Sequence, residues 1–562
     1  MFSFLNKTIK KRIELIGFWI ILSVEISALF LFILGLPPFH FGYWFQVEPQ
    51  TIGLHTIAAM CGIGLLIVGM GKPRLMRSSL THPLVLLPCA IGLLSLAGMT
   101  LSPFPFTSLL GSPEMGQGAI LFFDVAVLIA GGIVIRTSKK ASRVMVISAG
   151  VSVIGMIVFL LPVFIKMGWF SFTCNDFLAL PLITASVIFL TFWPVQRPRL
   201  LWILLCISIP LIFFSENQAA LALLPVVGLL YKLLWRRWPQ LISGRAFSTL
   251  MIVVMPVAVT AVINVAGSND TFYSLASRRE FHRLAANALS EQPHRIITGY
   301  GWGHLRELMI KYGTKGDRSI GGPGGKREWD AFKHNHPYTL NILLESFFAL
   351  GPWGPLLILI WLGCVPFFCP KGLMPFTMPF MVSYAGIWAA WYHPPSLVPF
   401  LALAFAGNAG RKRPFRLNPT FFPAFLLLTV ICIQAWGSWL VYRDSAACMA
   451  EKNLRSIDPS VTSNGHCPSP FGRYDRGGYL LADLLTSATS DVTFDIKRSR
   501  AVSPFHADLF KRRLCLVKNR LDDRPASLSL QTAFVLSLSA LIFTPADSSW
   551  EPERSIYLPE WK

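Results

Sequence analysis

Charged side chains are scarce in this sequence. Asp, Glu, Lys and Arg together make up 14% of its 562 residues, whereas about 25% is typical of soluble proteins. Since 53% of the residues are hydrophobic, a fold in water would leave a large apolar surface exposed. The composition therefore excludes an ordinary soluble globular protein and indicates a multi-spanning membrane protein, whose spans each need about 20 apolar residues.

Several chemical signatures are absent from the sequence. The ten cysteines form no C-x-x-C pair, so neither a zinc site of that type nor a redox motif is indicated. The H-E-x-x-H pattern of zinc enzymes is missing, and so is the D-x-D motif of many metal-dependent transferases that use nucleotide sugars. No internal repeat or low-complexity tract is present. We therefore expect an activity that needs neither a metal ion nor another cofactor.

The net charge is strongly positive, at +21, which raises the question of a nucleic-acid partner. The basic residues, however, gather in short clusters between apolar stretches, at residues 7–12, 72–77, 136–143, 196–199, 232–238 and 411–416. All of these clusters fall on one side if the apolar stretches cross a membrane in alternation. Because this is the positive-inside pattern, we expect a cytoplasmic N-terminus, contact with membrane lipids and no nucleic acid.

The apolar stretches predict an all-α, polytopic fold with about 12–13 transmembrane helices. The expected spans are residues 16–36, 52–70, 83–101, 118–135, 144–166, 177–193, 200–214, 218–235, 248–266, 339–369, 375–391, 395–408 and 420–441. The first is too long for the apolar region of a signal peptide, so we expect it to be retained. An odd number of crossings places the C-terminus outside, which is the periplasm of a Gram-negative cell.

Two segments outside the membrane are long. We expect residues 1–442 to form the membrane domain, with a periplasmic loop at about 267–338. Residues 443–562 are expected to form a small, mainly helical domain outside the membrane. In that domain, a disulfide between Cys448 and Cys467 and a pair of free thiols both remain open.

Histidine and arginine accumulate in the loop at 267–338. Five of the eleven histidines lie there, namely His282, His294, His304, His334 and His336. Arginine binds phosphate oxygens through a fork of N–H groups, and histidine transfers protons near neutral pH. The loop therefore suits an anionic lipid head group that undergoes a reaction. A solvated loop whose arginines touch lipid head groups is the alternative.

Two motifs lie in the first half of this loop. Residues 274–289 have the apolar spacing of an amphipathic helix at a membrane surface, with Arg278 in its first turns. The stretch "GYGWGHL" follows, with glycine at 299, 301 and 303. Alternating glycines permit a tight turn and the close approach of another group. Because no strand and helix frame these glycines, they are not a dinucleotide-binding fingerprint.

The stretch "AFKHNHPYTLNILLES", residues 331–346, ends the loop. Pro337 suits the first position of a helix, which places His336 at the helix cap. The free N–H groups of such a helix start favour an anion, and they keep a nearby histidine neutral. Glu345 would then lie about two turns into the helix, where a carboxylate is costly and needs a partner. Asn341, four residues earlier, is the expected partner.

Taken together, these motifs resemble the O-antigen ligase and polymerase superfamily, whose members are multi-span, metal-independent membrane glycosyltransferases. That family has an outside loop with an arginine helix, a G-x-G-x-G turn and a histidine motif. Leu and Glu follow that histidine at fixed spacing, as Leu340 and Glu345 follow His336 here. Residues 102–120 also resemble the family's earlier outside loop. The stretch "WYHPPSLVPF" at 391–400 resembles a late outside motif of its protein O-oligosaccharyltransferase branch.

The sequence departs from the family pattern at two places. The order "HNHP" replaces "HPHN", so both His334 and His336 remain candidates, and the spacing to Glu345 favours His336. A Ser-Arg pair expected near the eighth span is replaced by "SENQ", which contains Asn217 and Gln218. These two residues are the candidates for that position.

The resemblance implies an inverting transfer of a glycan from an undecaprenyl-pyrophosphate carrier, at the periplasmic face of a bacterial inner membrane. A lipid A–core acceptor, as for an O-antigen ligase, is our first expectation. A growing polysaccharide and a protein are the alternatives, and a non-enzymatic lipid or polysaccharide transporter is the rival class. The catalytic candidates are His336, His334 and Arg278. The substrate-binding candidates are Arg279, Arg283, Gly299, Gly301, Gly303, Asn341, Glu345, Asn217 and Gln218.

Overall fold

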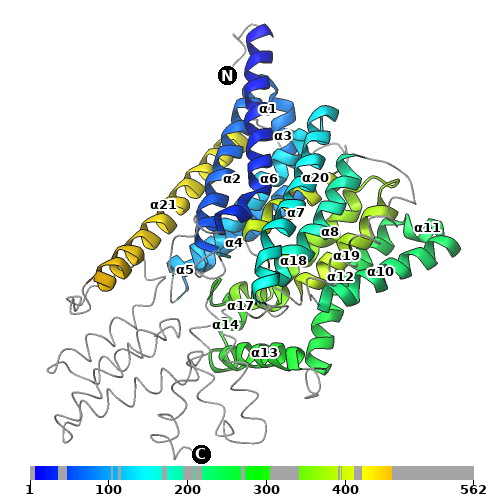
Figure 1. Cartoon of the computed structure of the whole chain (residues 1–562), viewed down its shortest axis with the longest axis vertical. Helices are drawn as coiled ribbons and strands as arrows, with labels where there is room; N and C mark the ends of the chain where they lie inside the picture. The colour runs from blue at the N-terminus through cyan, green and yellow to red at the C-terminus, as the bar shows by residue number, and fades with distance from the viewer. Residues whose placement is uncertain are drawn as a thin grey trace, which may run out of the picture.

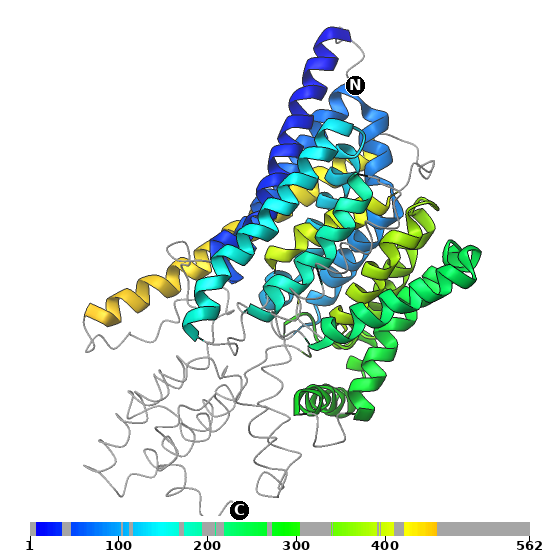
Figure 2. The same ribbon diagram turned by 45° about the vertical axis from the view of Figure 1, so that its right-hand side comes forward.

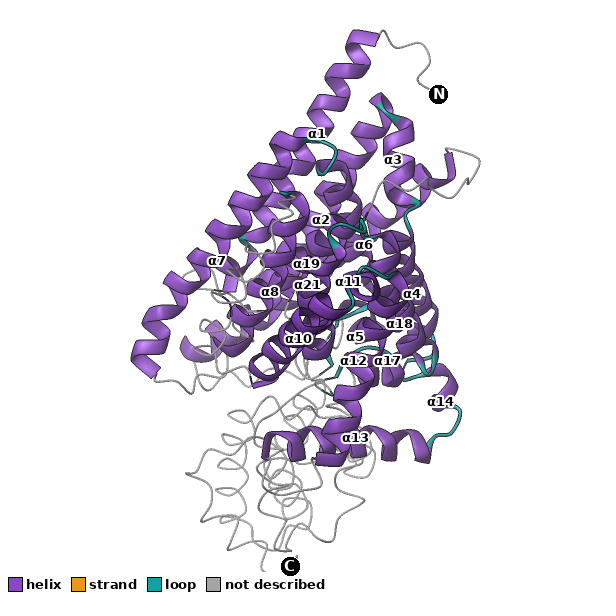
Figure 3. Cartoon of the chain, turned by 90° about the vertical axis from the view of Figure 1, so that its right-hand side faces the viewer, coloured by secondary structure: helices purple, strands orange, loops and turns teal. Residues whose placement is uncertain are grey.

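The computed structural model describes residues 7–35, 47–102, 105–111, 116–167, 174–193, 208, 218–266, 273–303, 339, 341–389, 393, 395–409 and 421–457 (Figure 1). Within these ranges the regular secondary structure is helical, with no strand (Figure 3). This outcome confirms the all-α prediction for the described part of the chain. It also agrees with the membrane requirement that backbone N–H and C=O groups be paired within a segment.

The long helices coincide with the predicted apolar spans. They are α1 (Lys7–Leu29), α2 (Val47–Gly71), α4 (Pro83–Met99), α6 (Ala119–Ile135), α7 (Lys139–Met167), α8 (Cys174–Phe192), α10 (Gln218–Arg237), α12 (Arg245–Ala266), α18 (Trp353–Phe368), α19 (Met374–Trp388), α20 (Val398–Asn408) and α21 (Phe421–Ile457). The remaining elements are η1 (Leu31–Gly35), α3 (Pro73–Leu80), α5 (Pro105–Leu110), α11 (Pro239–Ile242), α13 (Tyr273–Glu291), α14 (Arg295–Thr298), α17 (Ile342–Leu350) and η2 (Pro395–Leu397). The predicted span at 200–214 lies outside the described residues except for residue 208.

Four helical segments of the described chain are long and apolar enough to cross a membrane: Pro49–Gly71, Lys139–Val158, Arg245–Ala266 and Pro423–Arg443. The pair α3 and α4 is bent by 60° and forms a fifth if it is counted as one span. Shorter apolar helices, such as α6 and α18, lie beside them. The described residues therefore form a helical, multi-pass membrane bundle, while a total of 12–13 spans stays a prediction.

The predicted tenth span at 339–369 is not one helix. It consists of α17 and α18, which are separated at Gly351 and Pro352. Gly351 has a φ of 64°, a left-handed conformation that glycine adopts at helix ends without steric cost. The sequence "GPWG" therefore ends one helix and starts another, so the expectation of a single uninterrupted span was wrong.

The core of the bundle is built around α6, in which all residues except Ile133 are buried. It packs against α1, α2, α4, α20 and α21 (Figure 2). Two carboxylic acids lie in this apolar surrounding, Asp124 on α6 and Glu25 on α1, and both are fully buried. His55 Nδ1 lies 2.5 Å from Asp124 Oδ2, and Gln434 Nε2 donates to Asp124 Oδ1 over 3.0 Å. These contacts join α2, α6 and α21 inside the bundle.

Two groups of elements lie at opposite ends of the bundle (Figure 1). Helices α13, α14 and α17 gather at the end away from the N-terminus, and α13 runs across the axes of the long helices (Figures 1 and 3). Helix α3 lies toward the N-terminal end. The basic stretch 72–77, expected as a connection, largely belongs to α3, which starts with Pro73 at its first position.

Candidate functional site

The arginine helix is confirmed as α13, with Arg278 in its second turn. Arg278 is 6% exposed, and its neighbours on the same face, His282, Ala285 and Ala288, are also buried. Arg279 and Arg283, in contrast, are exposed. Because successive residues of a helix point about 100° apart, only one of the three candidate arginines faces the bundle. The structure thus separates Arg278 from the other two.

His282 lies one turn after Arg278 and is 7% exposed. Burial, reinforced by the positive charge of Arg278, lowers the pKa of this histidine to about 4. The imidazole is therefore neutral at pH 7. Its Nδ1 is 3.0 Å from Asn264 Oδ1 on α12, which makes Nδ1 the proton donor. Nε2 is then a buried acceptor, and it has no hydrogen-bond partner among the described residues.

We did not single out His282 from the sequence, although a signal was present. It follows Arg278 by four residues on a predicted helix, and side chains at that spacing share one face. The polar residues of α12 that meet this face, Thr260 and Asn264, were missed as well. They follow an apolar run and carry no pattern that marks a site.

The helix after the loop begins later than predicted. Helix α17 starts at Ile342, with Asn341 as its N-cap, and not at Pro337. Asn341 Oδ1 accepts hydrogen bonds from the N–H groups of Leu343, at 2.9 Å, and Leu344, at 3.2 Å. An asparagine at this position satisfies N–H groups that an intrahelical carbonyl cannot reach. Two of the N–H groups expected to hold a phosphate are therefore already occupied.

Glu345 is in the first turn of α17, not two turns into a helix. It is 1% exposed, and its Oε2 accepts from the backbone N–H of Thr339 over 3.0 Å. The side chain of Asn341, expected as the partner, instead donates from Nδ2 to Thr260 Oγ1 over 2.7 Å. Side chains of the protein therefore already accept hydrogen bonds from the backbone N–H groups at the start of α17, which disfavours the binding of a phosphate there.

Helix α12 connects the polar side chains of α13 with those at the start of α17. Thr260 binds Asn341, and Asn264, one turn later, binds His282. A continuous row of polar side chains therefore runs from Arg278 on α13 across α12 to Glu345 on α17. We call this row, made of Arg278, His282, Asn264, Thr260, Asn341 and Glu345, the polar row. It contains three of the candidate site residues and lies at the end of the bundle away from the N-terminus.

The glycine turn has the geometry that the sequence predicted. Gly299, Gly301 and Gly303 have φ values of 70°, 97° and 77°, which side chains with a Cβ rarely adopt. The N–H groups of Tyr300 and Gly301 donate to the carbonyls of Phe348 and Ala349 over 2.8 and 3.0 Å. The turn therefore satisfies carbonyl groups at the C-terminal end of α17 that have no partner within the helix.

Aromatic side chains pack on both sides of this turn and stabilise it. Tyr300 stacks on Phe348 with ring centroids 4.9 Å apart, and its hydroxyl donates to the carbonyl of Ala288 on α13 over 2.9 Å. Trp302 is 1% exposed, and its Nε1 donates to Ser95 Oγ on α4 over 2.8 Å. The turn thereby links the arginine helix, α17 and the membrane bundle in one rigid arrangement.

Two further segments that carry the family resemblance meet at this end of the bundle. Ser108 Oγ, which donates to Ser102 Oγ over 2.8 Å, lies where a Cβ on Gly301 would collide with it. Gln117 Nε2 donates to the carbonyl of His393 over 3.0 Å. Segments that separate sequence motifs predict to lie outside the membrane are therefore neighbours in the structure.

Other candidates fall outside what the structure describes. His334, His336 and Asn217 belong to this group, as does Cys467. Gln218 is the first residue of α10, and Cys448 lies in α21, but the side chains of both are outside the described part. Among the described residues, no three His, Cys, Asp or Glu side chains come together to hold a metal ion.

Comparison with known proteins adds no relative to this picture. No family model matches the sequence, no curated protein matches it, and no solved structure matches the fold. The family resemblance therefore rests on the motifs quoted above.

Proposed function

We propose that the protein is a membrane glycosyltransferase that moves a glycan from a polyprenyl-pyrophosphate carrier to an acceptor hydroxyl outside the cytoplasm. One observation carries the proposal. A buried arginine, Arg278, lies beside a neutral histidine, His282, in a polar row at the end of the bundle. Arg278 provides a cation that can bind a phosphate, and His282 provides a nitrogen that can accept a proton. Both lie next to apolar helices, against which the hydrocarbon chain of a lipid carrier can pack.

Arg278 would act on the leaving group. The acceptor oxygen forms a bond to the anomeric carbon while the bond from that carbon to the pyrophosphate oxygen breaks. Negative charge then develops on the departing pyrophosphate. A guanidinium group offers it two parallel N–H donors, and such a fixed cation stabilises a transition state most strongly where water is excluded. In a single displacement of this kind the anomeric configuration inverts.

The acceptor proton passes to a histidine. His336, or His334, is our first candidate for this base, because the family resemblance assigns the role to that motif. Thr339, whose N–H binds Glu345 in the polar row, follows His336 by three residues in the sequence. His282 is a second candidate, because its neutral imidazole has an acceptor nitrogen available.

The remaining predictions about location belong to this proposal. With 12–13 spans and a cytoplasmic N-terminus, the polar row faces the periplasm of a bacterial inner membrane, and residues 443–562 form a domain on that side. Lipid A–core is the first candidate acceptor, followed by a growing polysaccharide or a protein. Arg279 and Arg283, exposed on α13, would contact the carrier's phosphates or the membrane surface.

The experiment uses purified full-length protein in liposomes with an undecaprenyl-pyrophosphate-linked glycan and an acceptor. We expect Arg278→Lys to reduce the release of undecaprenyl pyrophosphate by about 100-fold, the usual cost of losing one donor to a transition-state oxyanion. Arg279→Lys, the neighbouring but exposed position, should retain far more activity. Equal activity of both variants and the wild type would refute the assignment of Arg278.

The base is identified by replacing His336, His334 and His282 separately with glutamine in the same assay. We expect one variant alone to lose activity, and added imidazole to restore that activity with the pH dependence of imidazole's own titration. That outcome would identify the replaced histidine as the base. A protein in which all three variants remain fully active does not use a histidine base from this set.

A transporter is the second candidate function, and a different observation favours it. The His55–Asp124 contact lies inside the membrane bundle, and ionisable side chains in such a place commonly mark ion or proton pathways. In the liposome assay, a transporter would move a labelled lipid-linked glycan across the membrane without releasing polyprenyl pyrophosphate. Asp124→Asn would abolish that movement, whereas a transferase should keep most of its turnover.

A further inference from the structure

Asn264, near the C-terminal end of α12, is the residue that the imidazole of His282 contacts. An amide side chain donates through its nitrogen and accepts through its oxygen, so its neighbours decide which end faces which group. Asn264 Nδ2 lies 2.9 Å from the backbone carbonyl of Thr260, and a carbonyl oxygen can only accept. The nitrogen of the amide therefore faces Thr260, and Oδ1 faces His282 Nδ1 at 3.0 Å.

This orientation of Asn264 decides which nitrogen of His282 carries the proton. Because Oδ1 can only accept, Nδ1 holds the hydrogen of the neutral ring, and Nε2 keeps its lone pair. Nε2 is buried and has no hydrogen-bond partner among the described residues. A buried acceptor without a partner is costly, so the arrangement favours a ligand that brings a hydroxyl group to this nitrogen.

Thr260 anchors the polar row on α12. Its carbonyl accepts from the amide of Asn264, and its hydroxyl oxygen accepts from Asn341 Nδ2 over 2.7 Å. The hydroxyl proton of Thr260 is itself donated to the carbonyl of Pro256 over 2.8 Å. Each of these hydrogen bonds therefore has one direction only, and His282 cannot exchange the roles of its two nitrogens without breaking its bond to Asn264.

The charges around His282 come from helices other than α12. Arg278 precedes it by one turn on α13, which packs against α12, α14 and α17. The ionisable residues of those three helices are Arg245, Arg295 and Glu345, and Arg245 lies at the far end of α12, about five turns from Asn264. A neutral amide, and not a carboxylate, thus holds the ring from α12. Without a negative charge there to stabilise an imidazolium, the ring remains an acceptor at neutral pH.

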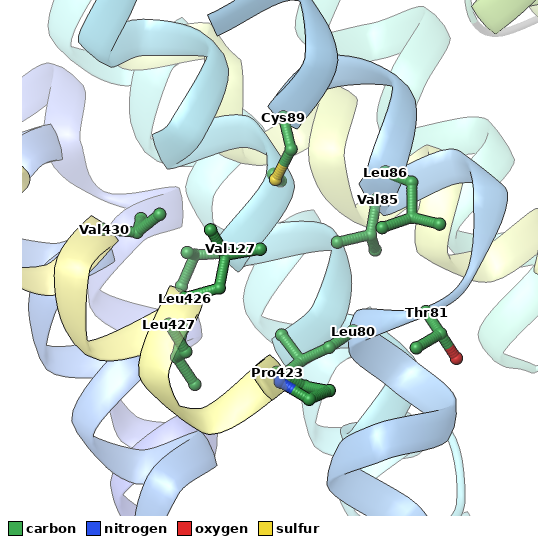
Figure 4. Close-up of a pocket in the computed structure, with 11 residues that line it drawn as sticks. Leu80, Thr81, Val85, Leu86, Cys89, Val127, Pro423, Leu426, Leu427 and Val430 are labelled. Carbon is green, nitrogen blue, oxygen red and sulfur yellow. The ribbon is translucent and has the colours of Figure 1, made fainter. Parts of the chain in front are cut away.

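The bundle also contains a small apolar cavity, between α4, α6 and α21 (Figure 4). Its volume is about 60 Å³, far below the roughly 300–1,000 Å³ that is usual for ligand sites. Its lining is apolar apart from Thr81 and Cys89, and the Thr81 hydroxyl donates to the carbonyl of Arg77. A glycan would lose hydrogen bonds to water there and regain few of them. The polar row therefore suits sugar hydroxyls better than this cavity does.

We propose that Asn264 is a positioning residue, which holds His282 with Nδ1–H toward α12 so that Nε2 accepts a hydrogen bond from a hydroxyl group of the glycan. The inference rests on the proposed function, because it brings the glycan to the polar row. It holds whichever histidine takes the proton of the acceptor, since binding a sugar hydroxyl orients the glycan without removing a proton.

Solid-state NMR of the full-length protein, labelled with ¹⁵N-histidine in liposomes, observes the two ring nitrogens directly. The signals of His282 are those that disappear in His282→Gln. We expect a protonated Nδ1 and an unprotonated Nε2 at pH 7, and we expect an undecaprenyl-pyrophosphate-linked glycan to shift the Nε2 signal. A protonated Nε2, or an Nε2 signal that the glycan leaves unchanged, would overturn the inference.

This experiment contains no acceptor, so its result does not require transfer. If the NMR result is as expected but the liposome assay shows no release of undecaprenyl pyrophosphate, glycosyl transfer is refuted while binding of the glycan by His282 is supported. Failure of the inference and failure of the proposed function are therefore distinguishable.

Two variants of Asn264 separate positioning from a structural role, and neither disturbs the core, because Asn264 is exposed. Asn264→Leu removes the acceptor for Nδ1–H, so we expect kcat/KM to fall by about 10-fold, as when metal-bound histidines lose such a partner. Asn264→Asp keeps an acceptor and adds a negative charge, which raises the pKa of His282. We expect Asn264→Asp to stay active at pH 8, with the acid limb of its kcat/KM profile moved to higher pH.

Asn287→Leu is the matched control, because it removes an amide from α13 outside the polar row. It should keep the activity and the pH profile of the wild type. Full activity of Asn264→Leu, or an unmoved acid limb in Asn264→Asp, would overturn the inference.

Discussion

Arg278 and Arg279 are adjacent in the sequence but differ in their surroundings. One is buried beside His282, and the other is exposed. The sequence predicted that an arginine of this helix matters, because three occur within six residues. It could not show which one faces the bundle, since the face that α13 presents is set by Asn264 and other residues far away in the chain. Asn341 likewise had a sequence signal as an N-cap residue, but the proline at 337 drew the prediction to the wrong position.

The first residue-scale prediction concerns the pH dependence of His282. Its pKa is about 4 in the folded protein and about 6.5 in an unfolded chain, so the unfolded state binds more protons between these values. The stability that neutral His282 contributes is therefore full above pH 6.5 and is lost as the pH falls toward 4. The loss amounts to at most about 3 kcal/mol.

This prediction is checked by thermal unfolding of the detergent-solubilised protein at pH 7.5, 6 and 5. The wild type should become less stable along that series. His282→Gln keeps a hydrogen-bonding amide but cannot titrate, so its stability should change less over the same range. Parallel slopes for the two proteins would show that His282 is not the titrating group.

The second residue-scale prediction concerns Asp124. Asp124→Ala leaves His55 Nδ1 and Gln434 Nε2 without their acceptor inside the bundle, so we expect a loss of about 1–3 kcal/mol for each buried group that is left unsatisfied. Asp124→Asn retains an acceptor and should cost less. Ser438→Ala is the control, because it removes a contact between the same helices, Ser438 Oγ to Thr56 Oγ1 at 2.8 Å, at a more exposed place. That change should cost about 0.6 kcal/mol.

At the scale of elements, apolar length predicted the spans well and predicted their interruptions poorly. A span needs about 20 apolar residues wherever it lies, so helices such as α2, α12 and α21 are visible in the sequence alone. The break at Gly351 depends instead on a single φ angle, and it is stabilised because the turn at Gly299 and Gly301 binds the end of α17. That contact joins residues about 50 positions apart, which local sequence patterns do not contain.

Gly301→Ala tests this contact. The new methyl group would meet Ser108 and would also force an alanine into a left-handed conformation, which alone costs about 1–2 kcal/mol. We expect a lower melting temperature and faster proteolysis of the chain next to the turn. Gly150→Ala is the control, because nothing lies within 4 Å of the added carbon in α7, and alanine favours a helix by about 1 kcal/mol. Similar melting temperatures for the two variants would contradict the role of the turn.

At the scale of the whole molecule, the basic helix α3 and the polar row lie at opposite ends of the bundle (Figure 1). Arg74 on α3 and Arg279 on α13 are both exposed and represent those two ends. The positive-inside pattern predicted the orientation of the chain. It could not predict that segments at 102–118, 299–303 and 393 would meet, because that meeting is made by helix packing and not by charge.

The orientation is tested by placing a single cysteine at position 74 or 279 in a variant that lacks the native cysteines. A membrane-impermeant maleimide added to spheroplasts should label the cysteine that replaces Arg279 and spare the one that replaces Arg74. After the membrane is permeabilised, both should react. Labelling of position 74 alone in intact spheroplasts would invert the orientation.

The pairing of the glycine turn with the end of α17 has a further consequence, which concerns loop-closure entropy. The hydrogen bonds from Tyr300 and Gly301 to Phe348 and Ala349 join the two ends of the chain segment 302–347. Holding the ends of a segment that long together costs on the order of 3 kcal/mol in chain entropy, and doubling its length adds only about 0.6 kcal/mol. Contacts made by residues outside the segment offset this loss of chain entropy. Insertions within residues 304–333 should therefore leave the turn and the polar row in place, so this part of the segment can change in length while the arginine helix stays fixed.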